Sequence, residues 1–196
     1  MKSESTLLKG VPIVLFKTQK AWATWLEKNH TKSSGVWLRL AKKRSEVKSL
    51  SYVEGVEVAL CYGWIDGQKE SYDDSSWLQK FTPRGTRSIW SKINREKAQE
   101  LIKNGQMKPA GLEAIENARQ NGRWEGAYDS PSGSTVPRDF EEALDKSPAA
   151  KAFFATINRA NRYAILFRIQ TAKKADTRAR RIKEFISMLE KKETLH

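Results

Sequence analysis

A group of aromatic, acidic and basic side chains in the middle of the chain is where the sequence most clearly offers chemistry. Trp64 and Asp66 lie in one short stretch, and Arg84, Arg87 and Trp90 follow further along the chain. Guanidinium groups are forked donors that fit a phosphate or a carboxylate, and indole rings form flat apolar walls. A carboxylate adds a fixed acceptor. Together these residues predict a pocket for an anionic small molecule or partner.

The same residues allow two other interpretations. Tryptophans most often serve core packing, and a desolvated Asp66 needs a partner, which Arg84 could supply across a hairpin. In an enzyme, Asp66 would act as a general base and Arg84 as an electrostatic stabiliser. The catalytic interpretation is the weakest, because no nucleophile, metal-ligand set or phosphate-binding loop accompanies Asp66 in the sequence. No catalytic residue is therefore assigned, and the sequence favours a protein that is not an enzyme without deciding the question.

Cysteine and histidine are too rare to suggest a metal or redox site. The chain has one cysteine and two histidines, which leaves no internal disulfide and disfavours zinc. Cys61 follows an apolar helical pattern, so we expect a small buried hydrophobe rather than a nucleophile. We expect no metal and no cofactor.

Apolar and alternating runs predict the β-strands that would hold the central residues, at residues 11–16, 35–41, 64–72 and 77–82. The last two strands would form a hairpin around a loop at residues 73–76. Trp64 and Asp66 lie on its first arm, and Arg84 follows its second. Asp66 and Gly67 could instead form a turn inside the first arm.

Capping residues predict where helices interrupt these strands. Thr18 is a candidate N-cap, and Ser51 with Glu54 has the spacing of a capping box. Gly63 stands where a helix needs a left-handed C-cap. Asn94 is a candidate N-cap for a later helix. The predicted fold class is α+β, with a small antiparallel sheet packed against helices.

The chain is predicted to contain two domains joined by a linker. Residues 123–136 are rich in glycine, serine and proline and lack helical periodicity. They separate an α+β domain at residues 1–122 from residues 137–196, where apolar spacings of three and four predict an all-helical C-terminal unit.

Positive charge supports a second hypothesis, that the protein binds nucleic acid. The formal net charge is +13, and Asp176 is the only acid between Lys151 and Lys183. Basic helices attract phosphates. The residues that would make these contacts are Lys173, Lys174, Arg178, Arg180, Arg181 and Lys183. Against this hypothesis, the sequence shows no helix-turn-helix signal, zinc pattern or RNP motif.

Several features predict a cytoplasmic protein. Residues 1–5 are polar and lack the apolar core of a secretory signal, and no apolar run approaches the length of a membrane span. A single cysteine agrees with a reducing compartment. We therefore expect no transmembrane segment.

Motifs in both halves carry a resemblance to a known family. The central motifs are ALCYGWIDG (59–67), FTPR (81–84) and SIWS (88–91), and the C-terminal ones are PRDF (137–140), TAKK (171–174) and TRARRI (177–182). Together they resemble the YdeI/OmpD-associated family, also called bacteriocin-protection proteins. The sequence departs from that resemblance at Arg168 and Gln170, where an aromatic residue and an acid are expected.

The resemblance implies a small bacterial cytosolic protein linked to tolerance of bacteriocins or cationic peptides, with no established reaction. Combined with the central residues, it predicts a stress-tolerance protein that binds an anionic ligand or partner near Asp66 and Arg84. Nucleic-acid binding by the C-terminal helices is the alternative, and catalysis by Asp66 is the third hypothesis.

Overall fold

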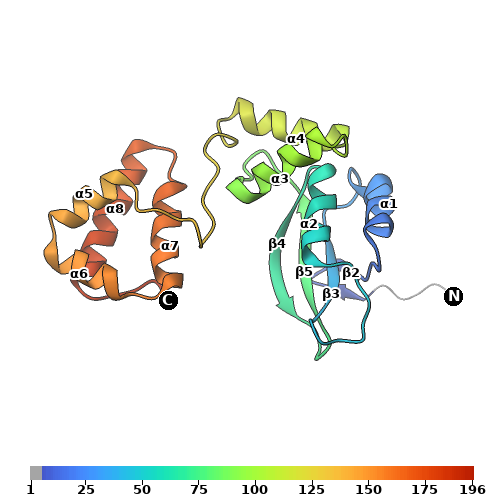
Figure 1. Ribbon diagram of the computed structural model, residues 1–196, viewed down its shortest axis with the longest axis horizontal. Coiled ribbons are helices and arrows are strands. Elements are labelled where there is room, and N and C mark those ends of the chain that lie inside the picture. Colours follow the sequence, from blue (N-terminus) through green and yellow to red (C-terminus); the bar gives the residue numbers. More distant parts are fainter. Residues whose placement is uncertain (1–5) are drawn as a thin grey trace. The chain divides into compact units, whose positions relative to one another are not determined.

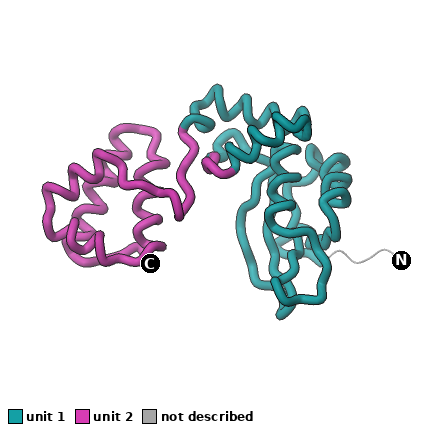
Figure 2. The backbone as a smooth tube through the Cα atoms, viewed as in Figure 1, with its two compact units in different colours: residues 1–89, 94–125 teal, residues 90–93, 126–196 magenta. Residues whose placement is uncertain are grey.

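The computed structural model describes residues 6–196, so the predicted absence of a signal at residues 1–5 lies outside the described residues. The chain divides into two compact units, which Figure 2 shows in different colours. The first comprises residues 1–89 and 94–125, and the second comprises residues 90–93 and 126–196. The first holds a β-sheet with helices and the second is mainly helical, so the fold class is α+β, as predicted.

The strands of the first unit form one mixed sheet (Figure 1). Within residues 6–196 the sheet has five strands in the order β1-β2-β3-β5-β4. Their bounds are Leu7–Leu8 for β1, Val11–Val14 for β2, Val36–Ala41 for β3, Trp64–Ser71 for β4 and Ser76–Pro83 for β5.

The prediction of an antiparallel sheet is wrong for one pair of strands. β2 and β3 are parallel, with Ile13 opposite Trp37. The helix α1 (Gln19–Asn29) connects them. A helix between two strands returns the chain to the end where the first strand began, so the second strand runs in the same direction. The pairs β3–β5 and β4–β5 are antiparallel, as predicted.

The β4–β5 hairpin contains a β-bulge where the sequence also allowed a turn. The register shifts between Asp66 and Lys69. The buried Gln79 on β5 stabilises the irregular backbone, because its Nε2 donates to the carbonyl oxygens of Gly67 at 3.0 Å and Gln68 at 3.2 Å. Asp66 and Gly67 therefore stay within the strand.

Local capping fixes the starts of α1 and α2 as predicted. Thr18 Oγ1 accepts from the N–H of Ala21, and Ser51 and Glu54 form a capping box at the start of α2 (Tyr52–Cys61). Gly63 follows α2 with a φ of +69°. The remaining helices are α3 (Lys92–Lys103) and α4 (Pro109–Gln120).

The predicted start of α3 at Asn94 is wrong, because pairing with a distant segment sets it earlier. Ser91 forms a parallel bridge with Tyr128. The N–H of Lys92 donates to the carbonyl of Tyr128 at 2.8 Å, and the N–H of Tyr128 donates to the carbonyl of Trp90 at 2.9 Å. These bonds join residues 90–93 to the second unit.

An aromatic cluster forms the centre of the first unit. Trp22 on α1 is fully buried, and its ring centroid lies 6.2 Å from that of Trp64 and 5.8 Å from that of Phe81. Trp22 Nε1 donates to the carbonyl of Gly55 at 3.1 Å, which ties α1 to α2. Edge-to-face aromatic packing adds to area burial, so this cluster connects both helices with β4 and β5.

The helix α4 packs closely against the end of α2. An added Cβ at Gly111 would lie 2.4 Å from the carbonyl oxygen of Cys61 and 2.4 Å from Met107 Sδ. No larger residue fits between these groups without a backbone shift. Gly111 therefore allows the close approach of the two helices.

The second unit consists of four predicted helices around one core. They are α5 (Arg138–Asp145), α6 (Pro148–Thr156), α7 (Arg159–Gln170) and α8 (Ala175–Glu190). Phe140 and Phe154 meet edge to face at 5.4 Å, and Ile165 and Leu189 are fully buried beside them. Asn158 caps α7, because its side chain accepts from the N–H of Asn161.

We expect Gly111→Ala to destabilise the protein although alanine favours a helix. The helix-propensity gain is about 1 kcal/mol, whereas the overlap with the Cys61 carbonyl forces α4 away from α2 and costs about 1–3 kcal/mol. Urea unfolding followed by tryptophan fluorescence measures the difference. Gly85→Ala is the matched control, because nothing lies within 4 Å of its added Cβ. A raised midpoint for Gly111→Ala would contradict the close approach, because it would show the propensity gain without the overlap.

Candidate functional site

Trp64 serves packing in this structure. Only 1% of its surface is exposed, its ring lies edge-on to those of Trp22 and Trp25, and its Nε1 donates to the carbonyl of His30 at 3.2 Å. Protein atoms therefore cover the indole, and Trp64 holds the start of β4 in place. The ligand-facing role predicted for Trp64 gains no support from this environment.

Asp66 is half-buried on β4 and has a partner that the sequence did not suggest. Its Oδ2 accepts a hydrogen bond from the hydroxyl of Tyr52 at 2.7 Å. Tyr52 is the first residue of α2, and its ring lies 6.0 Å from that of Trp77 on β5. The capping box predicted a helix beginning at Tyr52, but only the packing of α2 on the sheet brings the hydroxyl to Asp66.

The strand register separates Asp66 from Arg84. Asp66 lies opposite Phe81, whereas the N–H of Arg84 donates to the carbonyl of Gly63 at 2.9 Å. Three residues of extended strand span about 10 Å. The hairpin therefore does not place Asp66 and Arg84 opposite each other. Arg84 Nη1 donates to the carbonyl of Ile89 at 3.2 Å.

Arg87 stands on a tight turn after β5. The N–H of Gly85 donates to Ser88 Oγ at 3.0 Å, and the N–H of Ser88 donates to the Gly85 carbonyl at 2.9 Å. The Arg87 side chain is exposed on this turn. Trp90, the last residue of the predicted site, is buried and belongs to the second unit.

The end of α4 brings a further arginine to this turn. Asn121 Nδ2 donates to the carbonyl of Thr86 at 3.4 Å, which joins residues 84–88 to residues 121–124. We call these two segments the arginine loops. Arg123 lies in the second segment, and its Nε is buried without a hydrogen-bond partner. Sequence analysis missed Arg123, because nothing local indicates that the end of α4 meets the turn after β5.

Additional arginines hold the second of the arginine loops in place. Arg95 Nη1 donates to the carbonyl of Trp124 at 3.2 Å. The guanidinium of Arg119 lies 5.5 Å from the ring of Trp124, which is buried. Positive charge is therefore dense around these loops, and neither loop contains an aspartate or glutamate.

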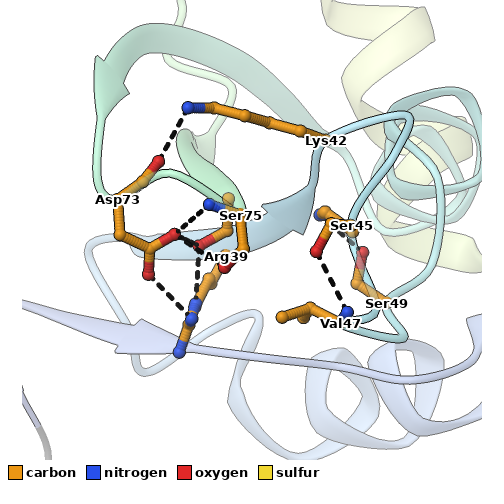
Figure 3. A network of polar contacts seen from close by, with 9 residues as sticks. Arg39, Lys42, Ser45, Val47, Ser49, Asp73 and Ser75 are labelled. Carbon is orange, nitrogen blue, oxygen red and sulfur yellow. Dashed lines mark hydrogen bonds and ion pairs between the residues drawn. The ribbon is translucent and has the colours of Figure 1, made fainter.

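Two basic residues, Arg39 on β3 and Lys42 directly after it, belong to a structural network of polar contacts (Figure 3). Arg39 Nη2 pairs with Asp73 Oδ2 at 2.8 Å, and Lys42 Nζ donates to the Asp73 carbonyl oxygen at 2.7 Å. Hydrogen bonds from Ser76 and Ser75 lower the pKa of Asp73 to about 2, so the carboxylate is charged across the neutral range. This network closes the β4–β5 hairpin.

Two of the basic residues proposed for nucleic-acid contacts are engaged inside the second unit. Arg178 donates to both oxygens of Asp139, at 2.5 and 2.8 Å, and its Nη1 donates to the Ile169 carbonyl. Arg181 donates to the Arg168 carbonyl. These bonds tie α8 to α5 and to the end of α7. The exposed members of the set are Lys173, Lys174, Arg180 and Lys183.

Other functional classes have little structural basis in the described part of the chain. Residues 6–196 contain no group of three His, Cys, Asp or Glu side chains arranged to hold a metal ion. Cys61 is buried, and burial raises the pKa of its thiol to about 11, which leaves the thiol protonated at neutral pH. Across the same residues, no helix combines the length and apolar character needed to cross a membrane.

Two protein-family models match the chain. A domain of unknown function, DUF8412, matches residues 14–114. The family described as bacteriocin-protection, YdeI or OmpD-associated matches residues 134–192. The second match confirms the family resemblance of the C-terminal motifs, whereas the central motifs fall in the domain of unknown function. Neither the curated proteins nor the solved structures give a match.

We expect the Asp73 network to stabilise the protein above pH 4 and to fail in acid. The folded-state pKa of Asp73 is about 2, below its ordinary value of 3.8, so its stabilising effect is lost as the pH falls from 3.8 towards 2. Asp73→Ala should lower the melting temperature at pH 7 and much less at pH 2.5. Asp74→Asn, at the exposed neighbouring residue, is the control. Equal losses at both pH values would argue against a charged Asp73 as the acceptor.

Proposed function

We propose that this chain, which belongs to the DUF8412 family by its match at residues 14–114, is a non-catalytic binding protein of the bacteriocin-tolerance type. The match of residues 134–192 to the bacteriocin-protection, YdeI or OmpD-associated family supports this proposal. Its ligand is a small anion or an anionic group of a partner, held at the arginine loops. A cytoplasmic location and a role in stress response are parts of the same proposal.

The observation that carries the proposal is the meeting of two segments that are far apart in the sequence. The bond from Asn121 to Thr86 joins the loop of Arg84 and Arg87 to the segment that carries Arg123. Guanidinium groups bind phosphate and carboxylate through paired hydrogen bonds, which suits a ligand with several negatively charged oxygens. Neither loop contains an aspartate or glutamate that could pair with these arginines from within the loops.

Arg123 strengthens the proposal through an unsatisfied donor. Its Nε is buried without a hydrogen-bond partner. A buried donor without an acceptor costs about 1–3 kcal/mol, and more when the group is charged. A small movement of the guanidinium toward a bound anion would recover that energy. A ligand would therefore be held partly by satisfying a donor that the folded chain leaves without an acceptor.

The proposal keeps part of the site predicted from sequence and gives other residues supporting roles. Arg84 and Arg87 stay as ligand-binding residues. Trp64 packs in the aromatic cluster at the start of β4, and Asp66 accepts a hydrogen bond from the hydroxyl of Tyr52. Both residues therefore help to fix the hairpin that leads into the arginine loops. Rigid elements behind a binding loop reduce the entropy lost when a ligand is bound.

We expect tripolyphosphate to raise the melting temperature of the protein, because a ligand that binds only the folded state stabilises it by about 2.7 kcal/mol at a hundred times its Kd. Arg87→Gln combined with Arg123→Gln should weaken binding at least about tenfold, since each charge-assisted hydrogen bond contributes about 1.5–3 kcal/mol. Isothermal titration calorimetry measures the affinity.

The matched control removes an equal charge elsewhere in the first unit. Arg44→Gln changes an exposed arginine after β3 and should leave the affinity within about twofold of the original. If the Arg87 and Arg123 double variant bound tripolyphosphate as tightly as Arg44→Gln, the arginine loops would not be the site. Arg84→Lys keeps the charge but loses the fork, so it should weaken binding if the bonds are paired.

The nucleic-acid alternative has a different outcome in the same assay. Duplex DNA that binds with a steep salt dependence, and whose binding is lost in Arg180→Gln with Lys183→Gln but not in the arginine-loop variant, would favour the C-terminal helices. The structure gives this alternative less support, because folding contacts already use Arg178 and Arg181.

A further inference from the structure

The second unit contains a cavity whose lining includes none of the arginine-loop residues. Its volume is about 950 Å³, within the size of cavities that hold small organic ligands. One face of α7 forms most of its wall, and the turn at residues 130–132, Ile93 and His196 complete it. Residues 159–160, 163–164 and 167–168 recur at the helical spacing of four, so they project from one side of the helix.

The apolar part of the cavity is a fixed aromatic wall. The rings of Tyr163 and Phe167 lie 5.8 Å apart, and Tyr128 packs edge to face against Phe167 at 4.9 Å. The Tyr163 hydroxyl donates to the carbonyl of Asp129 at 3.1 Å, which sets the orientation of this ring. Ile93 adds an aliphatic side chain that is 57% exposed. A flat apolar ligand surface can stack against such a wall.

Two arginines in the lining have donors to spare. Arg159 uses only Nε, in a long bond of 3.4 Å to the Pro131 carbonyl. Within residues 6–196 the guanidinium of Arg168 makes no hydrogen bond or ion pair, and its Nη1 is buried. Arg159 is exposed, whereas Arg168 is half-buried and has a buried donor without an acceptor, which is costly. A negatively charged ligand would accept from both guanidinium groups.

The charged side chains in the described lining are those of Arg159 and Arg168. No aspartate or glutamate side chain lines the cavity, and the hydroxyls of Ser130 and Ser132 add further donors at the turn. Asp129 is close by in sequence but is already engaged, with Oδ1 2.5 Å from Lys92 Nζ and Oδ2 accepting from Gln170 Nε2 at 2.9 Å. Burial raises the pKa of Asp129, but these two partners outweigh burial and lower it overall.

We propose that this cavity binds a small organic anion in which a carboxylate or phosphate group is joined to a flat aromatic body. The anionic group would bind Arg159 and Arg168, and the aromatic body would stack on Tyr163 and Phe167. Inorganic phosphate alone would leave the aromatic wall uncovered. This site goes beyond the proposed function, because it uses none of the arginine-loop residues.

The probes are 2-naphthoate, 2-naphthyl phosphate and the neutral 2-naphthalenemethanol, titrated into the full chain by calorimetry. We expect both anions to bind at least about tenfold more tightly than the neutral alcohol, because a tenfold change requires only about 1.4 kcal/mol of charge-assisted bonding. The tighter of the two anions identifies whether a carboxylate or a phosphate is preferred. Equal affinity for the alcohol and both anions would overturn the assignment of an anion site.

Variants then test the residues separately. Arg159→Gln and Arg168→Gln should each weaken the anions about tenfold and leave the alcohol unchanged, whereas Phe167→Ala should weaken all three probes. Arg180→Gln is the matched control, because its side chain is 70% exposed on α8 in the same unit and does not line the cavity. Naphthoate affinity that survives in both Arg159→Gln and Arg168→Gln would overturn the proposal.

The two anion sites are distinguishable. The double variant Arg87→Gln with Arg123→Gln should bind naphthoate normally, and Arg168→Gln should bind tripolyphosphate normally. Loss of naphthoate binding in the arginine-loop variant would place the aromatic anion there and overturn the proposal for the cavity, while leaving the proposed function intact.

Discussion

The hydrogen bond from Trp22 Nε1 to the carbonyl of Gly55, buried inside the aromatic cluster, is the constraint on which the first unit depends. A buried indole N–H needs an acceptor, and only a close approach of α1 and α2 supplies this one. Around it, Trp64 and Phe81 bring β4 and β5 against the same helices. The position of the hairpin, and therefore of the loop that leaves it at Arg84, follows from this packing.

Arginine has two different roles in this protein, and burial and partners separate them. Arg39 and Arg178 are fixed by carboxylates, and they close the hairpin and join two helices. Arg168 and Arg123 instead have buried nitrogens without hydrogen-bond partners. A positive net charge does not distinguish these groups, because it counts every guanidinium alike. The hydrogen-bond partners of each arginine do distinguish the two groups. They indicate that a ligand binds where a guanidinium lacks an acceptor, rather than where arginines are most numerous.

Gln170 shows how one residue can fit its surroundings in a way that the family resemblance does not suggest. Its Oε1 accepts from the N–H of Asp129 at 3.2 Å, and its Nε2 donates to the carboxylate of Asp129 at 2.9 Å. An acid at position 170 would place two carboxylates together at a largely buried site, which is unfavourable. The amide therefore allows Asp129 to remain charged beside Lys92.

Local chemistry in the sequence determined the fold class, the hairpin and the starts of helices at Thr18 and Ser51, because caps and periodicity act over only a few residues. The tertiary structure decided the parallel pairing of β2 with β3, the contact between Tyr52 and Asp66, and the contact of Asn121 with the loop after β5. Each depends on strand register or on packing between distant segments, and the residues involved carry no local signal of their partners. The central motif therefore indicated the right region, and long-range packing chose which of its side chains remain available to a ligand.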